Sequence, residues 1–210
     1  MKNEPLFKII AIAGLASVFL AFASAAHAAD KEKETTRTGT YTTSKGGSGT
    51  TSSTTTRANG VVNKQGTWTN AAGGTGNWQS QTNWNKATQT ATVNGSATRP
   101  NGATTTWQGT KAVTAPGTIT GNGTITRANG SQATYQSTDT KVAPGTWDKN
   151  TVITNPNGTT VDRSVQTTVN GSNGTRTETT TLPNGQTVTR NATFTQTQTT
   201  IPSPSPAPSQ

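Results

Sequence analysis

Beyond residue 28 the chain alternates apolar and polar positions with a period of two, which is the spacing of a β-strand. In the segment 187–194, Val188, Ala192 and Phe194 share one face with Arg190, whereas threonine and asparagine share the other. No segment of this region spaces its apolar residues as a helix would. The pattern therefore predicts that this part of the chain is all-β or unstructured.

Asn-Gly dipeptides interrupt this alternation. They are the strongest short-range signal for a hairpin, because a type I′ turn needs positive φ at both central residues. They begin at residues 59, 94, 101, 122, 129, 157, 170, 173 and 184. The nearly symmetric segment 118–126, centred on Gly121–Asn122–Gly123, is predicted to form one such hairpin.

A five-residue tag ending in Asn-Gly recurs along the chain, as in Thr126–Arg127–Ala128–Asn129–Gly130. Variants occupy residues 56–60, 98–102, 126–130, 154–158 and 181–185. From the second tag onward the final glycines are 28, 28 and 27 residues apart. Such regular self-similarity indicates a repeat architecture. Other turn signals lie midway between the tags, so turns recur every ~14 residues.

Two β architectures fit this spacing. In the first, strands of roughly ten residues pair in sequence as an antiparallel meander, and one repeat makes one hairpin. In the second, weaker turn signals at Gly66, Gly95, Gly109 and Gly123 halve the spacing, which suits the short strands of a β-solenoid. The abundance of Asn-Gly favours the meander, since solenoid corners do not need type I′ geometry.

Residues 1–28 have the three parts of a signal peptide: a basic start, an apolar run over 9–22, and small residues at Ala26 and Ala28. The apolar run is too short for a comfortable membrane span. Cleavage after Ala28 is therefore expected, with no transmembrane segment in the remaining chain.

The remaining chain divides by composition. Residues 29–56 are rich in threonine, serine and glycine and are predicted to be a flexible linker. Residues 57–200 hold the β repeats, and the Pro/Ser-rich residues 201–210 are predicted to be a disordered tail. A chain this poor in leucine, isoleucine, valine and phenylalanine is not expected to bury a conventional core.

The residues that remain after cleavage exclude most catalytic chemistry. They include no histidine, cysteine or methionine, so neither a catalytic triad nor the usual zinc sites can form. Asp139, Asp148, Asp162 and Glu178 lie in different repeats, and three have a basic neighbour, so surface ion pairs are expected rather than a glycosidase pair. We predict no enzyme activity, no cofactor and no metal site.

The five tryptophans, Trp68, Trp78, Trp84, Trp107 and Trp147, allow two interpretations. They could form an aromatic platform that stacks on sugar rings or bases. The favoured alternative is that they form what little core the chain has. Trp68, Trp107 and Trp147 are the candidate ligand contacts.

Three arginines, Arg57, Arg99 and Arg127, recur just before a turn. A row of arginines along a sheet edge would attract anionic polymers, in keeping with a net charge of +9 that falls to +8 after cleavage. The same row would also protect the edge against aggregation. The strands lack an outward apolar band and aromatic girdles, so an outer-membrane barrel is not expected.

In general character the chain resembles the Thr/Asn/Gly-rich repeat proteins that Gram-negative bacteria export, through its signal peptide and its Pro-Asn-Gly or Ala-Asn-Gly tags. This implies a non-enzymatic structural protein of matrix or adhesion type, secreted or at the cell surface. Its expected partners are itself and anionic polysaccharide or another extracellular polymer, but not intracellular nucleic acid. The alternatives are a soluble carbohydrate-binding module that uses exposed tryptophans, a periplasmic location, and an ice-binding threonine array.

Overall fold

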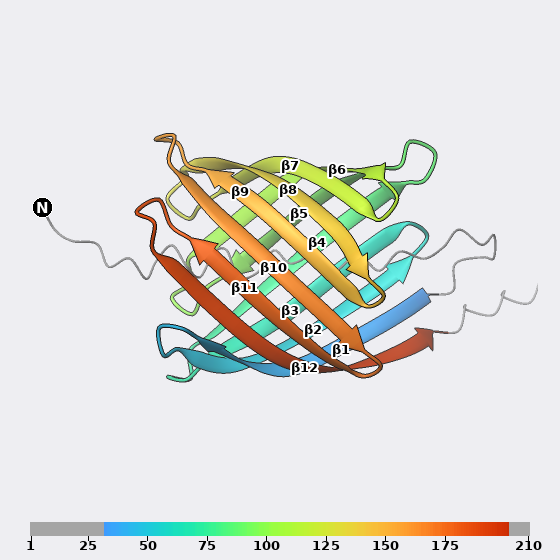
Figure 1. Ribbon diagram of the computed structural model, residues 1–210, viewed down its shortest axis with the longest axis horizontal. Coiled ribbons are helices and arrows are strands. Elements are labelled where there is room, and N and C mark those ends of the chain that lie inside the picture. The colour runs from blue at the N-terminus through green and yellow to red at the C-terminus, as the bar shows by residue number, and fades with distance from the viewer. Residues whose placement is uncertain (1–31, 202–210) are drawn as a thin grey trace, which may run out of the picture.

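The computed structural model describes residues 32–201, which form twelve antiparallel strands closed into one barrel (Figure 1). Each strand pairs with the next along the chain, and β1 pairs with β12. The strands are β1 (Glu32–Thr43), β2 (Ser48–Ala58), β3 (Val61–Asn70), β4 (Thr75–Asn85), β5 (Thr90–Thr98), β6 (Thr104–Ala115), β7 (Thr118–Thr126), β8 (Gln132–Ala143), β9 (Thr146–Thr154), β10 (Thr160–Asn170), β11 (Asn173–Thr181) and β12 (Thr187–Ile201).

The predicted all-β antiparallel meander is confirmed, and the alternative β-solenoid is wrong. One repeat forms one hairpin: residues 103–130, for example, contain β6, β7 and the turn that follows. Because the sheet closes on itself, it has no edge along which a row of arginines could lie. The described residues contain no helix that could cross a membrane.

Four of the recurring tags form turns at one end of the barrel, at residues 98–102, 126–130, 154–158 and 181–185, whereas the tag at 56–60 forms the β2–β3 turn at the other end. In the tag at 98–102, the Arg99 amide donates to the Ala103 carbonyl, the Gly102 amide donates to the Arg99 carbonyl, and Gly102 has a φ of +79°. This is a hairpin loop that ends in a left-handed glycine. The expected type I′ pattern, with positive φ at both residues, occurs at Asn59–Gly60.

Several Asn-Gly dipeptides were wrongly predicted as turns. Those that begin at 94, 122 and 173 lie inside strands, and residues 118–126 form the single strand β7 rather than a hairpin. Gly123 is directly paired with Tyr135 of β8, and a side chain on Gly123 would collide with the Tyr135 ring. The glycine is therefore needed for a close aromatic contact rather than for a turn.

The predicted flexible linker over 29–56 contributes strands instead. Residues 32–56 form β1 and most of β2, and β1 closes the barrel against β12. Threonine favours strands when neighbouring strands are present to pair with, and this long-range pairing is not visible in the local composition. The signal peptide and nearly all of the predicted disordered tail lie outside the described residues.

The two faces of the barrel wall differ sharply in chemistry. Buried apolar side chains point inward, and one cluster joins Ala133, Ile153 and Val161 with Ile125 and Tyr135 packed against it. All the aromatic residues of the strands occupy inward positions; they are Tyr41, Trp68, Trp78, Trp84, Trp107, Tyr135, Trp147 and Phe194. The sparse apolar content of the sequence is thus concentrated inside the barrel.

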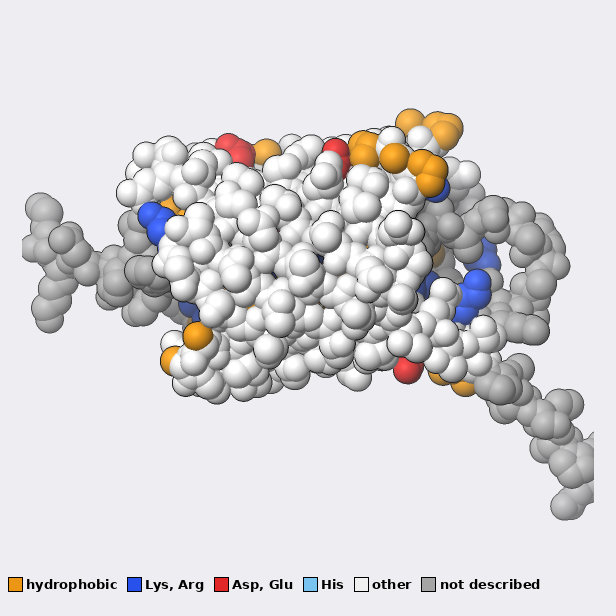
Figure 2. Space-filling model, turned by 60° about the horizontal axis from the view of Figure 1, so that its bottom comes forward, with side chains coloured by type: hydrophobic (Ala, Val, Ile, Leu, Met, Phe, Trp, Pro, Cys, Tyr) orange, Lys and Arg blue, Asp and Glu red, His pale blue; other side chains and the backbone are white. Residues whose placement is uncertain are grey.

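The outer face is made almost wholly of uncharged polar side chains. Figure 2 shows one side of it, where apolar and basic side chains gather mainly toward the two ends. Threonine hydroxyls bond across neighbouring strands, as in Thr69–Thr75 at 3.1 Å and Thr98–Thr104 at 3.0 Å. Among the described residues, the exposed large apolar side chains are Val142 and Val152, with 50% and 42% of their surface accessible. The wall thus lacks the apolar band that faces lipid in outer-membrane barrels.

Candidate functional site: the barrel lumen

Basic residues of the strands all occupy inward positions. By strand register they are Lys33, Arg37, Arg57, Lys64, Lys111, Lys141, Lys149, Arg163, Arg176 and Arg190. Four of the six strand carboxylates, Glu32, Glu34, Asp148 and Asp162, point outward instead. The lumen therefore has a strong excess of positive charge, whereas the charges on the outer wall are acidic.

One inward carboxylate, Asp139 of β8, lies between two lysines. Its carboxylate oxygens are 3.7 Å from Lys111 Nζ and 3.4 Å from Lys149 Nζ. Burial lowers the pKa of Lys111 to about 7, assisted by the nearby Lys149 and opposed by Asp139. A single carboxylate thus faces two lysine amino groups, and the lowered pKa leaves Lys111 about half protonated near pH 7.

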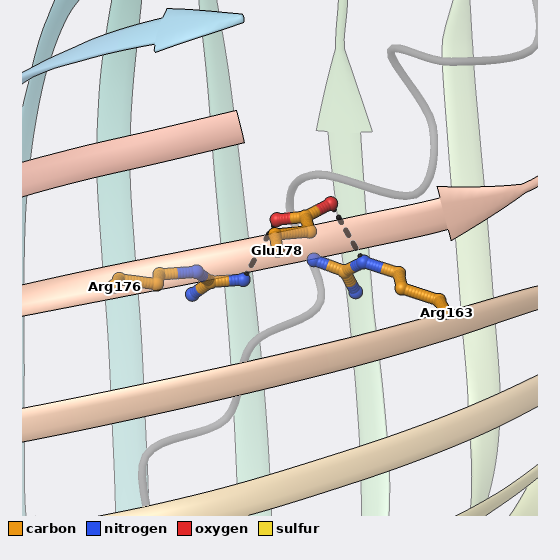
Figure 3. A network of polar contacts seen from close by, with 3 residues as sticks. All are labelled: Arg163, Arg176 and Glu178. Carbon is orange, nitrogen blue, oxygen red and sulfur yellow. Dashed lines mark hydrogen bonds and ion pairs between the residues drawn. The ribbon is translucent and has the colours of Figure 1, made fainter. Parts of the chain in front are cut away.

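The other inward carboxylate, Glu178 of β11, lies between two arginines (Figure 3). Its Oε1 accepts a hydrogen bond from Arg163 Nε at 2.7 Å, and its Oε2 accepts one from Arg176 Nη2 at 3.0 Å. Burial would raise the pKa of the Glu178 carboxyl, but Arg163 and Arg176 outweigh burial and lower that pKa from 4.5 to about 2. Glu178 therefore remains charged over most of the pH range.

The lowered pKa of Glu178 predicts acid-sensitive stability. A carboxyl whose folded pKa lies below its unfolded value stabilises the fold above the unfolded pKa, and that contribution is lost as the pH falls through the folded pKa. We expect the free energy of unfolding to fall between pH 4.5 and 2. Urea unfolding at a series of pH values measures it, and Glu178→Gln should flatten this part of the profile. An unchanged profile in the variant would contradict the assignment.

A cavity of about 430 Å³ occupies the lumen beside β1–β4, β11 and β12. Its lining includes Arg37, Lys64, Arg99, Arg176 and Arg190, with Glu178 as the one carboxylate. Nε of Arg190 and one terminal nitrogen of Arg99 are buried and have no hydrogen-bond partner among the described residues. Both residues are only part-buried and line the cavity, so their guanidinium groups lie where an anionic ligand could contact them.

Aromatic rings line the same cavity: Tyr41, Trp68, Trp78 and Phe194. The guanidinium carbon of Arg190 lies 3.9 Å from the centre of the Tyr41 ring, and that of Arg37 lies 5.1 Å from the centre of the Phe194 ring. Arg37 also donates two hydrogen bonds to Gln196 Oε1, at 3.0 and 2.9 Å. Stacking and hydrogen bonds of this kind fix the direction in which each guanidinium points.

The structure places the six predicted ligand contacts in different surroundings. Trp68 and Arg99 line the cavity. Trp107, Trp147 and Arg57 occupy inward positions away from it, on β6, β9 and β2. Arg127 lies in the turn between β7 and β8, where it donates a hydrogen bond to the Asn155 side chain.

Sequence reasoning missed Arg37, Lys64, Arg176, Arg190, Tyr41 and Phe194 of the cavity, and it placed the ion pairs of Asp139 and Glu178 on the surface. The signal that could have found them was the alternation itself. In residues 187–194 the arginine shares a face with the apolar residues, which marks that face as a lumen containing both kinds of side chain. The described residues hold no group of three or more potential metal ligands.

No protein-family model and no curated protein matches the sequence. Several solved structures share the fold, and two of them are KdgM porin structures. One, a KdgM porin, has a TM-score of 0.56 and 8% identity, over 78% of this chain and 98% of the other. The second, a KdgM porin in complex with disordered oligogalacturonate, has a TM-score of 0.53 and 7% identity, over 78% and 97%. The fold is that of a porin barrel. At such identities the likeness extends to the fold alone, and the resemblance to Thr/Asn/Gly-rich repeat proteins stays an expectation.

These findings correct the predicted function and location. A closed barrel with the fold of a porin contradicts the secreted or cell-surface matrix or adhesion protein, the periplasmic alternative and the soluble module with exposed tryptophans, whose rings in fact face the lumen. The ice-binding array is also wrong, because the threonines cover a curved barrel wall instead of one flat face. Porins are not enzymes as a class, although the lack of catalysis in this chain stays a prediction, as does self-association.

Proposed function

We propose that the barrel takes acidic oligosaccharides into its lumen and binds them there. The observation that carries this proposal is the sorting of charge, with every basic residue of the strands inward and most strand carboxylates outward. Such a distribution draws anions to the lumen and away from the wall. The complex of a KdgM porin with oligogalacturonate supports an acidic saccharide as the ligand class.

Calorimetric titration of the purified chain with oligogalacturonate tests this proposal, with a neutral maltooligosaccharide of equal length as the reference ligand. We expect binding of the acidic ligand alone, and we expect it to weaken as salt is added, because the attraction is screened. Equal binding of both ligands, or binding of neither, would overturn the proposal.

Paired substitution of two arginines that line the cavity, Arg99 and Arg190, locates the site. A hydrogen bond to a charged group contributes about 1.5–3 kcal/mol, so loss of two such bonds in the Arg99→Gln, Arg190→Gln double variant should weaken oligogalacturonate binding by a factor of roughly 10² to 10⁴. Lys86→Gln, in the turn between β4 and β5 at the opposite end of the barrel, removes the same charge as a control and should leave the affinity nearly unchanged.

Passage of the same ligands along the barrel axis is a second candidate function, favoured by the shared fold with porins. It predicts anion-selective conductance when the chain is added to a planar lipid bilayer. Ligand binding without any conductance would leave lumenal binding as the sole function.

A further inference from the structure

Two tryptophans of the cavity wall cross onto each other's strand. The register of β3 and β4 pairs Trp68 with Gly76 and Gly66 with Trp78. Each ring therefore lies opposite a glycine of the neighbouring strand, and the two pairs are only two positions apart. The two tryptophans thus occupy diagonally neighbouring positions on the inner wall, and we call the pair the tryptophan platform (Trp68 and Trp78).

Glycine allows both rings to lie directly against the wall. A Cβ atom on Gly76 would lie 2.1 Å from Cζ2 of Trp68, and one on Gly66 would lie 2.7 Å from Nε1 of Trp78. The rings thus occupy the space where side chains of the opposite strand would begin. Covering a strand glycine with a cross-strand aromatic ring is a known stabilising arrangement, and both rings still line the cavity.

The tryptophan platform borders the cavity rather than filling a closed core. Both rings are half-buried and line the 430 Å³ cavity together with Arg99 and Arg190. An aromatic surface beside guanidinium donors matches a sugar acid, which has an apolar ring face and a carboxylate on its edge. A polyanion without rings would satisfy the guanidiniums and leave the platform uncovered.

We propose that the tryptophan platform stacks against the pyranose rings of the ligand while Arg99 and Arg190 bind its carboxylates. This inference rests on the proposed function and adds the reason why the lumen selects acidic sugars over other polyanions. Aromatic rings offer a broad apolar surface at little cost in side-chain entropy. The platform is the element that discriminates, whereas the basic residues attract anions of any kind.

Two ligands of equal charge, oligogalacturonate and a polyglutamate peptide, separate stacking on the tryptophan platform from attraction by the basic residues. Trp68→Leu with Trp78→Leu should weaken oligogalacturonate binding at least tenfold, by analogy with the stacking of bases on aromatic side chains, and should leave polyglutamate binding unchanged. Trp147→Leu, an inward tryptophan that does not line the cavity, is the matched control and should change neither affinity.

A glycine variant tests whether the position of the Trp68 ring matters, without removing the ring. The three atoms nearest to a Cβ on Gly76 all belong to the Trp68 ring, so Gly76→Ala should displace that ring and lower oligogalacturonate affinity. Gly121→Ala, whose Cβ would meet atoms no closer than 3.1 Å, is the control. Circular dichroism verifies that each variant folds.

The outcomes separate the two proposals. Loss of sugar binding with retained polyglutamate binding supports the platform. If the tryptophan variants lose both ligands equally, or neither, the platform is wrong while lumenal binding stands. If the unmodified chain binds neither ligand, the proposed function itself fails.

Discussion

Replacing Glu178 with glutamine should lower the free energy of unfolding by about 3–5 kcal/mol, the usual cost of removing one partner from a buried ion pair. In the folded barrel the Glu178 carboxylate accepts hydrogen bonds from Arg163 and Arg176. Without its negative charge, two guanidiniums remain buried side by side with no compensating anion. Equilibrium unfolding in urea, followed by tryptophan fluorescence, measures the change.

Asp162→Asn is the matched control for this variant. Asp162 lies on β10 next to Arg163 but points outward and is exposed, so its neutralisation should change stability by less than about 1 kcal/mol. Equal effects of the two substitutions would contradict the inward placement of Glu178. A smaller loss in a double variant that also carries Arg163→Met would confirm that the penalty comes from the uncompensated cation.

The folded chain should stay monodisperse in buffer without detergent. Moving an unpaired amide or hydroxyl from water to an apolar medium costs about 2–7 kcal/mol, and the outer wall consists of such groups on every strand. Bonds between neighbouring threonines lower the cost for some of them but leave the wall strongly hydrophilic. Size-exclusion chromatography with light scattering, in the presence and absence of detergent, measures the effect.

A wall variant provides the comparison. Gln108, Thr124 and Thr134 lie side by side on the outer face of β6, β7 and β8. Their joint replacement by leucine creates an apolar patch, and we expect this variant to associate unless detergent is present. Aggregation of the unmodified chain in plain buffer, together with insertion into liposomes, would refute this prediction and would favour the second candidate function, passage of ligands across a lipid bilayer.

Strands and turns were predictable because they depend on local signals. The period-two alternation located the strands, and the tags at 98–102, 126–130, 154–158 and 181–185 marked the hairpin loops at one end of the barrel. The composition of 29–56, by contrast, predicted a linker, because nothing local distinguishes a threonine-rich strand from threonine-rich coil. The pairing of β1 with β12 decides that question, and it joins residues near opposite ends of the sequence.

The site was less predictable than the fold. Arg99 and Trp68 were singled out one by one, but the cavity joins them with Tyr41 and Arg190, from β1 and β12. Only the closure of the sheet brings these strands together. The mid-strand glycines were misinterpreted for a related reason. In this chain an Asn-Gly dipeptide marks either a turn or a strand glycine that is covered by an aromatic ring of the neighbouring strand. Which of the two it marks depends on the residue paired with the glycine, and the local sequence does not show that residue.

The correspondence between one repeat and one hairpin makes the barrel modular. Residues 131–158 contain β8, β9 and the tag that follows, so their removal would join the tag at 126–130 directly to β10. The new neighbours would again be antiparallel, and the loop between them would keep its sequence signature. Because barrel diameter grows with strand number, duplication or loss of such a unit during evolution would widen or narrow the lumen two strands at a time. The diameter of the lumen would then depend on the number of repeats in the gene, and the fold would stay the same.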